Sequence, residues 1–165
     1  MKCLNCENKK DIKKIVTNYK YKESGLNNVI LQGVTFFKCE ECNEEYYNFG
    51  DIEQLHNKIA EILLKKSDLL TAKEIRFLRK NVGYSGMMFA HLIGYSHEYL
   101  SRIENAKTEI TESFDRLVRF AIATKSCKDR AYDLHDLILK KTGKNLIRIE
   151  LEKTDNGDWE EKLAA

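Results

Sequence analysis

Two Cys-x-x-Cys pairs, Cys3/Cys6 and Cys39/Cys42, constrain this chain more than any other feature of its sequence. Each pair sets two thiolates on one tight loop, so both sulfurs can bind the same metal ion. Together the pairs offer four soft ligands, which close a tetrahedral zinc site and leave no coordination position for a substrate. The sequence therefore predicts one structural Zn²⁺ per chain, and the small domain that holds it would draw much of its folding free energy from the metal.

Three other uses of these cysteines fit the sequence less well. A dithiol redox enzyme needs only one pair, usually at a helix N-terminus after a strand, and no strand precedes Cys3. Two disulfides would suit a secreted protein, but an apolar signal segment is not found at the N-terminus. A catalytic zinc would keep an open position. We therefore expect a cytoplasmic protein that is not an enzyme, in which the fifth cysteine, Cys127, is a buried or partly buried thiol.

Charge is close to balanced over the whole chain but uneven along it. The net charge is +2, so binding to nucleic acid would have to come from local charge. No apolar run approaches the length of a transmembrane helix. An acidic rim near the second Cys pair is a candidate docking surface for a basic protein, although such runs are usually solvated faces. It comprises Glu40, Glu41, Glu44, Glu45, Asp51 and Glu53.

The pattern of apolar residues predicts an α+β protein of four regions. A small β-rich, zinc-ribbon-like domain comes first, and a connecting helix, an all-α domain and a C-terminal extension follow it. These regions are expected at residues 1–50, 51–67, 68–126 and 127–165. Within the first region, β-branched and aromatic residues predict strands at 12–21, 29–38 and 46–49, and apolar residues at helical spacing predict a connecting helix at 52–65.

The C-terminal extension gives fewer signals. A helix is expected to stop at Gly143, and alternating apolar residues predict a strand at 146–151. This extension can enlarge the all-α domain, form a dimer contact, or fold back on the zinc domain. The dimer contact is the favoured interpretation, without any indication of which surface pairs.

Cap signals and helical spacing predict four helices in the all-α region. They are expected at residues 71–81, 85–94, 97–105 and 114–124. Thr71 and Glu74 form a capping box, and Ser85 and Ser96 are N-caps of the second and third helices. Gly94 lies where the short turn between those helices needs a left-handed residue. Two short helices joined by a Gly-containing turn of this length are typical of a helix-turn-helix.

The stretch from Ser85 to Lys107 resembles the Xre/Cro-type helix-turn-helix of bacterial and phage repressors. The residues that carry the resemblance are Phe89-Ala90, Ile93-Gly94-Tyr95-Ser96 and Leu100-Ser101-Arg102-Ile103-Glu104-Asn105-Ala106-Lys107. Three departures stand out: Gly86 replaces the usual Gln, Ala106 replaces the usual Gly, and the Pro common a few residues later is missing.

A four-cysteine zinc domain followed by this module is similar to the MqsA/YgiT-type antitoxins. The resemblance implies a DNA-binding transcriptional regulator, the antitoxin of a type II toxin–antitoxin pair. Such a protein binds a toxin, here expected to be basic, through the zinc domain and represses its own operon through the helix-turn-helix. The alternative is a free-standing phage- or plasmid-type Xre repressor whose zinc domain is structural.

The resemblance also implies which residues touch double-stranded DNA. In this fold the third helix enters the major groove, and homodimers bind palindromic operators. Arg102 can contact guanine through two hydrogen bonds, and Glu98 can accept one from cytosine. Helix N-termini and Lys107 favour phosphate. The candidate DNA-contacting residues are Ser85, Gly86, Ser96, His97, Glu98, Tyr99, Ser101, Arg102 and Lys107.

Two further pairs of residues are expected to have structural roles. In repressors that look like this one, an arginine of the first helix pairs with the glutamate that ends the recognition helix. Arg79 and Glu104 are therefore expected to form a partly buried ion pair rather than contact DNA. Met87 and Met88 are expected in the core or at its edge.

Overall fold

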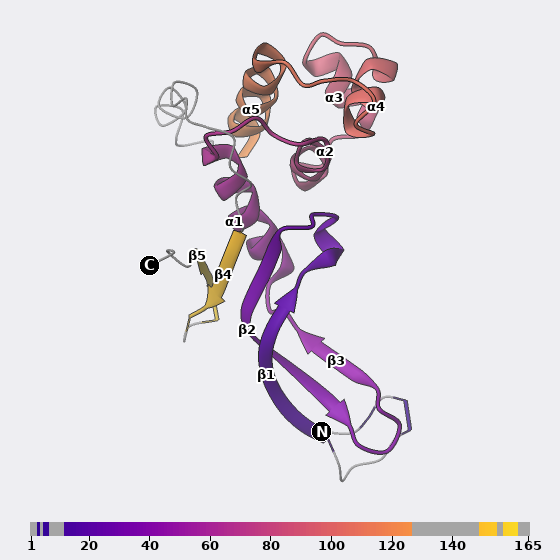
Figure 1. Cartoon of the computed structure of the whole chain (residues 1–165), viewed down its shortest axis with the longest axis vertical. Coiled ribbons are helices and arrows are strands. Elements are labelled where there is room, and N and C mark those ends of the chain that lie inside the picture. The colour runs from indigo at the N-terminus through magenta and orange to yellow at the C-terminus, as the bar shows by residue number, and fades with distance from the viewer. Residues whose placement is uncertain (1–2, 4, 7–11, 127–148, 155–156, 162–165) are drawn as a thin grey trace. The chain divides into compact units, whose positions relative to one another are not determined.

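The computed structural model describes residues 3, 5–6, 12–126, 149–154 and 157–161 (Figure 1). Within those residues the fold is mixed α+β, with a five-stranded sheet and five α-helices. The chain forms two compact units. The sheet unit comprises Met1–Lys22, Asn27–Leu55 and Arg148–Ala165, and the helical unit comprises Glu23–Leu26 and His56–Ile147. The chain therefore returns to the sheet unit after passing through the helical unit.

The sheet unit is organised around one long central strand, β2. Its strands are β1 (Ile12–Lys20), β2 (Val29–Cys39), β3 (Glu45–Asn48), β4 (Ile149–Lys153) and β5 (Trp159–Glu161). β2 pairs antiparallel with β1 and β3 and parallel with β4, and β5 pairs antiparallel with β4 (Figure 1). The strands predicted at 12–21, 29–38 and 46–49 are confirmed to within one residue at each end.

A β-bulge interrupts the β1–β2 ladder. Thr17 pairs with Val34 and Tyr19 pairs with Leu31, so one residue of β1 faces two residues of β2. Gly33 lies in the bulge at φ 69°, a left-handed conformation that glycine adopts without steric cost. Because the extra residue shifts the phase of the alternation, Leu31 and Val34 are both buried.

The C-terminal strands belong to the sheet unit. Val29 of β2 lies opposite Ile149 of β4, and the β4–β5 hairpin is closed by a hydrogen bond from Thr154 N to Asp158 O at 2.8 Å. The sequence left three placements open for the C-terminal extension. β4 and β5 take the one in which the extension folds back on the N-terminal strands. The helix expected to end at Gly143 and the first residues of the expected strand lie outside the described residues.

The sheet unit buries a small apolar core. Trp159 is 3% exposed, and its Nε1 donates a hydrogen bond to Phe49 O at 3.1 Å. Because this is the only tryptophan of the chain, its fluorescence reports on this unit alone. The buried apolar residues of the unit include Tyr21, Val29, Leu31, Val34, Leu55, Ile149, Leu151 and Trp159.

The helical unit is built from short amphipathic helices. They are α1 (Ile52–Lys65), α2 (Ala72–Asn81), α3 (Gly86–Leu92), α4 (His97–Glu104) and α5 (Glu112–Ser126). Of α1, the part from residue 56 onward belongs to this unit. α4 packs against α2 and α3, and α5 packs against α2. The predicted spans agree to within two residues at each end, with α3 shorter and α5 longer than predicted. The largest fully buried side chains of this unit are Ile59, Leu63, Leu70, Ile75, Leu78, Phe89, Leu100, Ile103, Phe114 and Ile122. Among the described residues, no helix is long and apolar enough to cross a membrane.

A buried arginine fixes the end of α1 to α5. Arg119 Nε donates to Asp115 Oδ2 at 2.8 Å, and both side chains are at most 7% exposed. Its Nη1 and Nη2 donate to four backbone carbonyls, two in the last turn of α1 and two in the connection that follows it. These acceptors are the carbonyl oxygens of Leu63, Leu64, Lys66 and Asp68. Asp115 also accepts a hydrogen bond from Leu70 N at 2.7 Å. The Arg119–Asp115 ion pair therefore holds the connection between α1 and α2 against α5.

Candidate metal centre and nucleic-acid interface

The second Cys-x-x-Cys pair lies in the tight turn between β2 and β3. Cys39 is the last residue of β2, and its N–H donates to Glu44 O at 3.0 Å. Asn43 N donates in turn to Cys39 O at 3.0 Å, and Asn43 adopts φ 58°, which asparagine tolerates better than most residues. The turn therefore presents Cys39 and Cys42 from one short, hydrogen-bonded loop.

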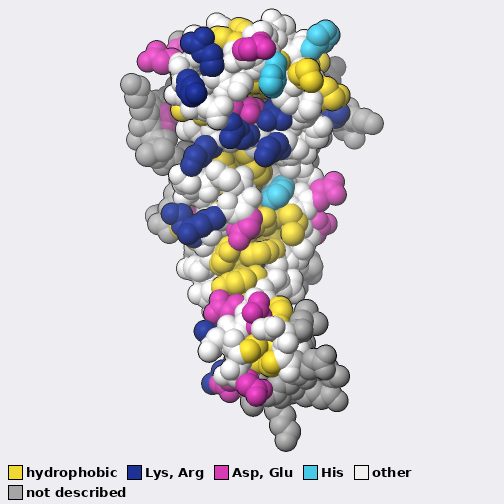
Figure 2. All heavy atoms as spheres, turned by 90° about the vertical axis from the view of Figure 1, so that its right-hand side faces the viewer, with side chains coloured by type: hydrophobic (Ala, Val, Ile, Leu, Met, Phe, Trp, Pro, Cys, Tyr) yellow, Lys and Arg dark blue, Asp and Glu magenta, His cyan; other side chains and the backbone are white. Residues whose placement is uncertain are grey.

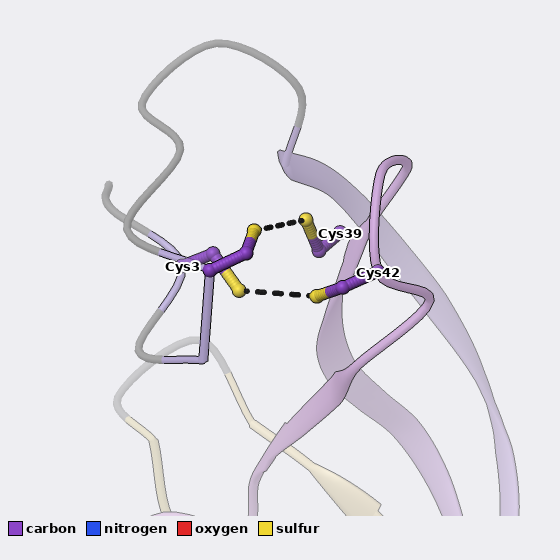
Figure 3. Close-up of side chains that lie close together, drawn as sticks. Cys3, Cys39 and Cys42 are labelled. Atoms are coloured by element: carbon purple, nitrogen blue, oxygen red, sulfur yellow. Dashed lines mark hydrogen bonds between the residues drawn. The ribbon is translucent and has the colours of Figure 1, made fainter.

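The structure brings the four predicted ligands together. Their sulfur atoms all lie within 4.8 Å of one another. Cys3 Sγ is 3.5 Å from Cys42 Sγ, and Cys6 Sγ is 3.6 Å from Cys39 Sγ (Figure 3). A tetrahedral zinc site with Zn–S bonds of about 2.3 Å has sulfur–sulfur separations of about 3.8 Å. The cysteines are free thiols, well beyond the bond length of about 2.05 Å that a disulfide requires.

Hydrogen bonds to Cys3 favour the ionised form of its thiol. Tyr46 Oη lies 3.3 Å from Cys3 Sγ, and this hydrogen bond, with a weaker one from the backbone of Cys6, lowers the pKa of the Cys3 thiol to about 6. For Cys42, a hydrogen bond from the backbone of Glu44 lowers the pKa. Burial and the neighbouring thiols outweigh that bond, so the pKa of Cys42 is raised overall. A metal ligand must be a thiolate, so an ion bound here would displace the remaining thiol protons.

Tyr46 was not anticipated from the sequence. It follows Cys42 by four residues on β3 and faces Cys3 across the cluster. An aromatic residue after a Cys-x-x-Cys turn predicts only a strand, because no local pattern distinguishes a tyrosine hydroxyl that reaches a sulfur from one that reaches solvent. Within the described residues, the only group of His, Cys, Asp or Glu side chains arranged for a metal is this four-cysteine centre.

The predicted N-caps and turn of α3 and α4 are present. Ser85 Oγ accepts from Met88 N at 3.2 Å, and Ser96 Oγ accepts from Tyr99 N at 3.1 Å. Gly94, in the turn between the helices, has φ 74°. These local contacts fix where α4 starts and the direction in which it leaves α3.

The candidate DNA-contacting residues divide into an exposed and a packed group. His97, Glu98 and Arg102 are exposed on α4, and Lys107 is exposed in the turn that follows it. Figure 2 shows Lys, Arg, His and acidic side chains on one face of the helical unit. The exposed residues of α4 and the turn are therefore available to a ligand.

Tyr99 and Ser101 are partly occupied by contacts within the helical unit. The Tyr99 ring stacks on Tyr95 at 4.9 Å between centroids and meets the Phe114 ring edge-on at 5.7 Å. The hydroxyl and carbonyl of Ser101 accept from Asn105 Nδ2 at 3.4 and 2.7 Å. Both residues thus brace α4, and this leaves less of each free for DNA.

Glu98 interacts with the start of its own helix. Its carboxylate accepts a hydrogen bond from its own backbone N–H and another from the Ser96 side chain. These contacts lower the pKa of Glu98, and the neighbouring His97 lowers it further. A carboxylate at a helix N-terminus is stabilised by the helix dipole and competes there with a phosphate.

Gly86 explains one departure from the repressor pattern. A Cβ placed at Gly86 would lie 3.0 Å from Nε2 and 3.2 Å from Cδ2 of His97. The His97 ring thus occupies the space beside the start of α3 where a side chain would otherwise project. A side chain at position 86 would therefore require this ring to shift by a few tenths of an ångström.

The expected ion pair between Arg79 and Glu104 is formed. Arg79 Nε donates to Glu104 Oε1 at 2.6 Å, and Arg79 Nη2 donates to Oε2 at 2.9 Å. Arg79 Nη1 also donates to Tyr84 O at 2.7 Å. A second arginine was missed: Arg76 Nε donates to Glu104 Oε2 at 3.1 Å, and its Nη2 donates to Asn105 Oδ1 at 2.9 Å. The sequence signal for this contact was the spacing of the two arginines, because residues three apart share one face of a helix.

The expectation for the two methionines of α3 was wrong. Met87 and Met88 are 70% and 60% exposed, and Leu92 on the same helix is 52% exposed. Only Phe89 and Ala90 of α3 are buried. A helix of seven residues has room for one buried stripe, and Phe89 and Ala90 already fill it.

Comparison with family models, with curated proteins and with solved structures finds no match for this chain. Function is therefore inferred from the geometry of the two sites. The four-cysteine cluster of the sheet unit and the capped α3–α4 pair of the helical unit are the features on which it depends.

Proposed function

We propose that this protein is a sequence-specific DNA-binding transcriptional regulator. In this proposal α2–α5 form an Xre-type helix-turn-helix domain, and α4 is the recognition helix. The sheet unit is a zinc-ribbon-like domain whose four cysteines hold one structural Zn²⁺. The observation that carries the DNA-binding proposal is α4 itself, which is capped at Ser96, anchored through Glu104, and exposes His97 and Arg102.

Charge supports the same proposal. Residues 56–126 contain twelve Lys and Arg against eight Asp and Glu, a net charge of +4 in a chain whose total is +2. The excess of positive charge is therefore concentrated in the segment that holds α2–α5. Lysine and arginine side chains supply the salt-dependent attraction to DNA phosphates on which such domains depend.

DNA binding is tested on α4 by fluorescence anisotropy with the promoter region of the protein's own gene. Arg102→Ala is expected to weaken specific binding by about one to two orders of magnitude, because a bidentate arginine–guanine contact is worth about 1–3 kcal/mol. Arg116→Ala is the matched control, since Arg116 is an exposed arginine of α5 that pairs with Glu112. If Arg102→Ala binds the promoter as tightly as the control does, α4 is not the recognition helix.

Glu98 provides a second, independent probe of the same helix. Removal of its charge in Glu98→Gln takes a carboxylate away from the start of α4, so binding to DNA of any sequence is expected to tighten. Sequence preference is expected to fall if Glu98 also accepts from cytosine. Unchanged affinity for both promoter and scrambled DNA would place Glu98 away from the duplex.

The antitoxin role is supported by a surface of the sheet unit. Tyr19, Phe36, Tyr47 and Phe49 form a cluster of rings with centroid separations from 4.7 to 5.9 Å. Figure 2 shows hydrophobic side chains gathered on the sheet unit with acidic side chains beside them. Glu45 accepts hydrogen bonds from Tyr47 Oη at 2.8 Å and Lys38 Nζ at 3.1 Å, and both lower its pKa, so this carboxylate stays charged. An aromatic surface with an acidic rim suits a basic protein partner.

Co-purification separates the antitoxin from the free-standing repressor. The protein is co-expressed with the product of the neighbouring gene, and a stoichiometric complex that Tyr47→Ala weakens supports the antitoxin role. A Val16→Ala variant is the control, because Val16 is 62% exposed on β1 and takes no part in the ring cluster. DNA binding without any complex would favour the repressor with a structural zinc domain.

A further inference from the structure

A row of basic side chains runs along α2. Lys73, Arg76 and Lys80 are spaced by three and four residues, so they share one face of the helix. Lys73 and Lys80 are exposed, and the Arg76 side chain is 41% exposed. We call these three residues the α2 basic stripe. It spans about 10 Å along the helix, at about 1.5 Å per residue.

The stripe adjoins the turn that ends the recognition helix. Arg76 Nη2 bonds to Asn105 Oδ1 at 2.9 Å, directly before the exposed Lys107 turn. The start of α2 lies beside the same turn, because Ala72, next to Lys73, lines a shallow pocket with Ala106 and Lys107. Two separate contacts therefore make the stripe continuous with the end of α4.

The positive charge of this surface is compensated only in part, by Glu104 at Arg76 and by Glu109, which lines the same shallow pocket as Lys107. Glu74 is the only acidic residue of α2, and it is buried in an ion pair with Lys66. Glu104 is shared by Arg76 and Arg79. Within residues 12–126, no salt bridge involves Lys73, Lys80, Arg102 or Lys107. Figure 2 shows Lys and Arg side chains gathered on this unit.

We propose that the α2 basic stripe is a second DNA contact, which binds backbone phosphates beside the groove that α4 enters. The inference rests on the proposed DNA-binding function and extends it to residues outside the α3–α4 pair. Lysine contacts to phosphate add affinity and position the protein but carry no sequence information. Since Arg76 is partly held by Glu104, Lys73 and Lys80 supply most of the contact.

The test compares salt dependence between two double variants of the full-length protein. Binding to promoter and scrambled DNA is measured between about 50 and 200 mM salt, where phosphate contacts dominate the slope. For Lys73→Gln/Lys80→Gln, the slope of log K against log salt is expected to fall by about 1.8, or about 0.9 for each lost contact. Affinity for both DNAs is expected to fall by the same factor, so the specificity ratio stays unchanged.

The control removes the same charge elsewhere in the helical unit. Lys58→Gln/Lys65→Gln changes two lysines of α1 that pair with Glu61, and its slope is expected to stay near that of the wild type. If the stripe variant keeps the slope and affinity of this control while Arg102→Ala still loses promoter binding, the stripe does not contact DNA and the proposed function stands. If the wild-type protein binds neither DNA at low salt, the proposed function fails and the stripe inference falls with it.

Discussion

Arg79 donates two hydrogen bonds to the carboxylate of Glu104, at 2.6 and 2.9 Å, with both side chains at most 9% exposed. Glu104→Gln leaves this arginine without its counter-charge in the core. We expect the free energy of unfolding to fall by about 3 kcal/mol, the usual size for breaking a buried ion pair from one side. Chemical denaturation followed by circular dichroism measures the loss. Glu112→Gln removes an exposed paired carboxylate and should cost less than about 0.5 kcal/mol.

The same pair makes stability depend on pH. Burial alone would raise the pKa of Glu104, but hydrogen bonds and charge from Arg79, and then from Arg76, hold it below the ordinary value of 4.5. A carboxyl whose pKa is lowered by folding stabilises the fold above its unfolded pKa, and this stabilisation disappears as pH falls through the folded pKa. The difference in unfolding free energy between wild type and Glu104→Gln should therefore be constant near neutral pH and shrink below about pH 4.5. A difference that persists at much lower pH contradicts the ionised pair.

Much of this structure was predictable because its signals are local. A capping box at Thr71 and N-caps at Ser85 and Ser96 mark helix starts within a few residues, and those helices begin where expected. The four ligand cysteines could be paired from spacing, since two tight turns that bind one ion must meet. The Arg79–Glu104 pair came from resemblance to repressors, and its distances agree with that expectation.

The rest depends on contacts between residues far apart in the chain. The parallel pairing of Val29 with Ile149 joins strands separated by the whole helical unit, and no local signal specifies it. Gly33 within a strand is the one local hint of the bulge. Arg119 looks like any helical arginine until its five hydrogen bonds are seen, because its partners come from the end of another helix. Exposure of Met87 was missed since a short helix has too few turns to show its buried face.

The turn after α4 holds an alanine where the backbone favours glycine. Ala106 has φ 56°, and the left-handed region costs residues with a Cβ roughly 1–2 kcal/mol. Ala106→Gly removes that cost but adds flexibility to the unfolded chain, so we expect a net gain of up to about 1 kcal/mol in unfolding free energy. Gly94→Ala is the reverse control: φ is 74° and no atom lies within 4 Å of the added Cβ, so strain alone should destabilise it. Loss of stability in Ala106→Gly contradicts this account.

Metal removal should unfold one unit and spare the other. Structural zinc contributes roughly 10 kcal/mol or more to the folding of small metal domains. A chelator, or Cys39→Ser, is therefore expected to abolish the cooperative fluorescence transition of Trp159, which is buried in the sheet unit. The far-UV circular dichroism of the helices should keep its own transition. Elemental analysis should find one zinc per chain in the wild type.

The control for the metal experiment is the fifth cysteine. Cys127, whose expected burial lies outside the described residues, is not one of the four predicted ligands, so Cys127→Ser should retain full zinc content and the Trp159 transition. A protein that is folded and free of metal as isolated, with reactive thiols at Cys3 and Cys6, would instead favour a dithiol redox site.

Two arginines on α5 allow a direct comparison of a buried and an exposed ion pair. Arg119 pairs with Asp115 and Arg116 pairs with Glu112, each across four residues of one helix. Arg119→Met leaves Asp115 without its counter-charge and removes a donor from four carbonyls in the last turn of α1 and the connection after it, so we expect a loss of at least about 3–5 kcal/mol. Arg116→Met removes only a solvated pair and should change unfolding free energy by less than about 0.5 kcal/mol. Denaturant unfolding of the two variants in parallel measures both values, and similar losses would mean that Arg119 does not hold α1 against α5.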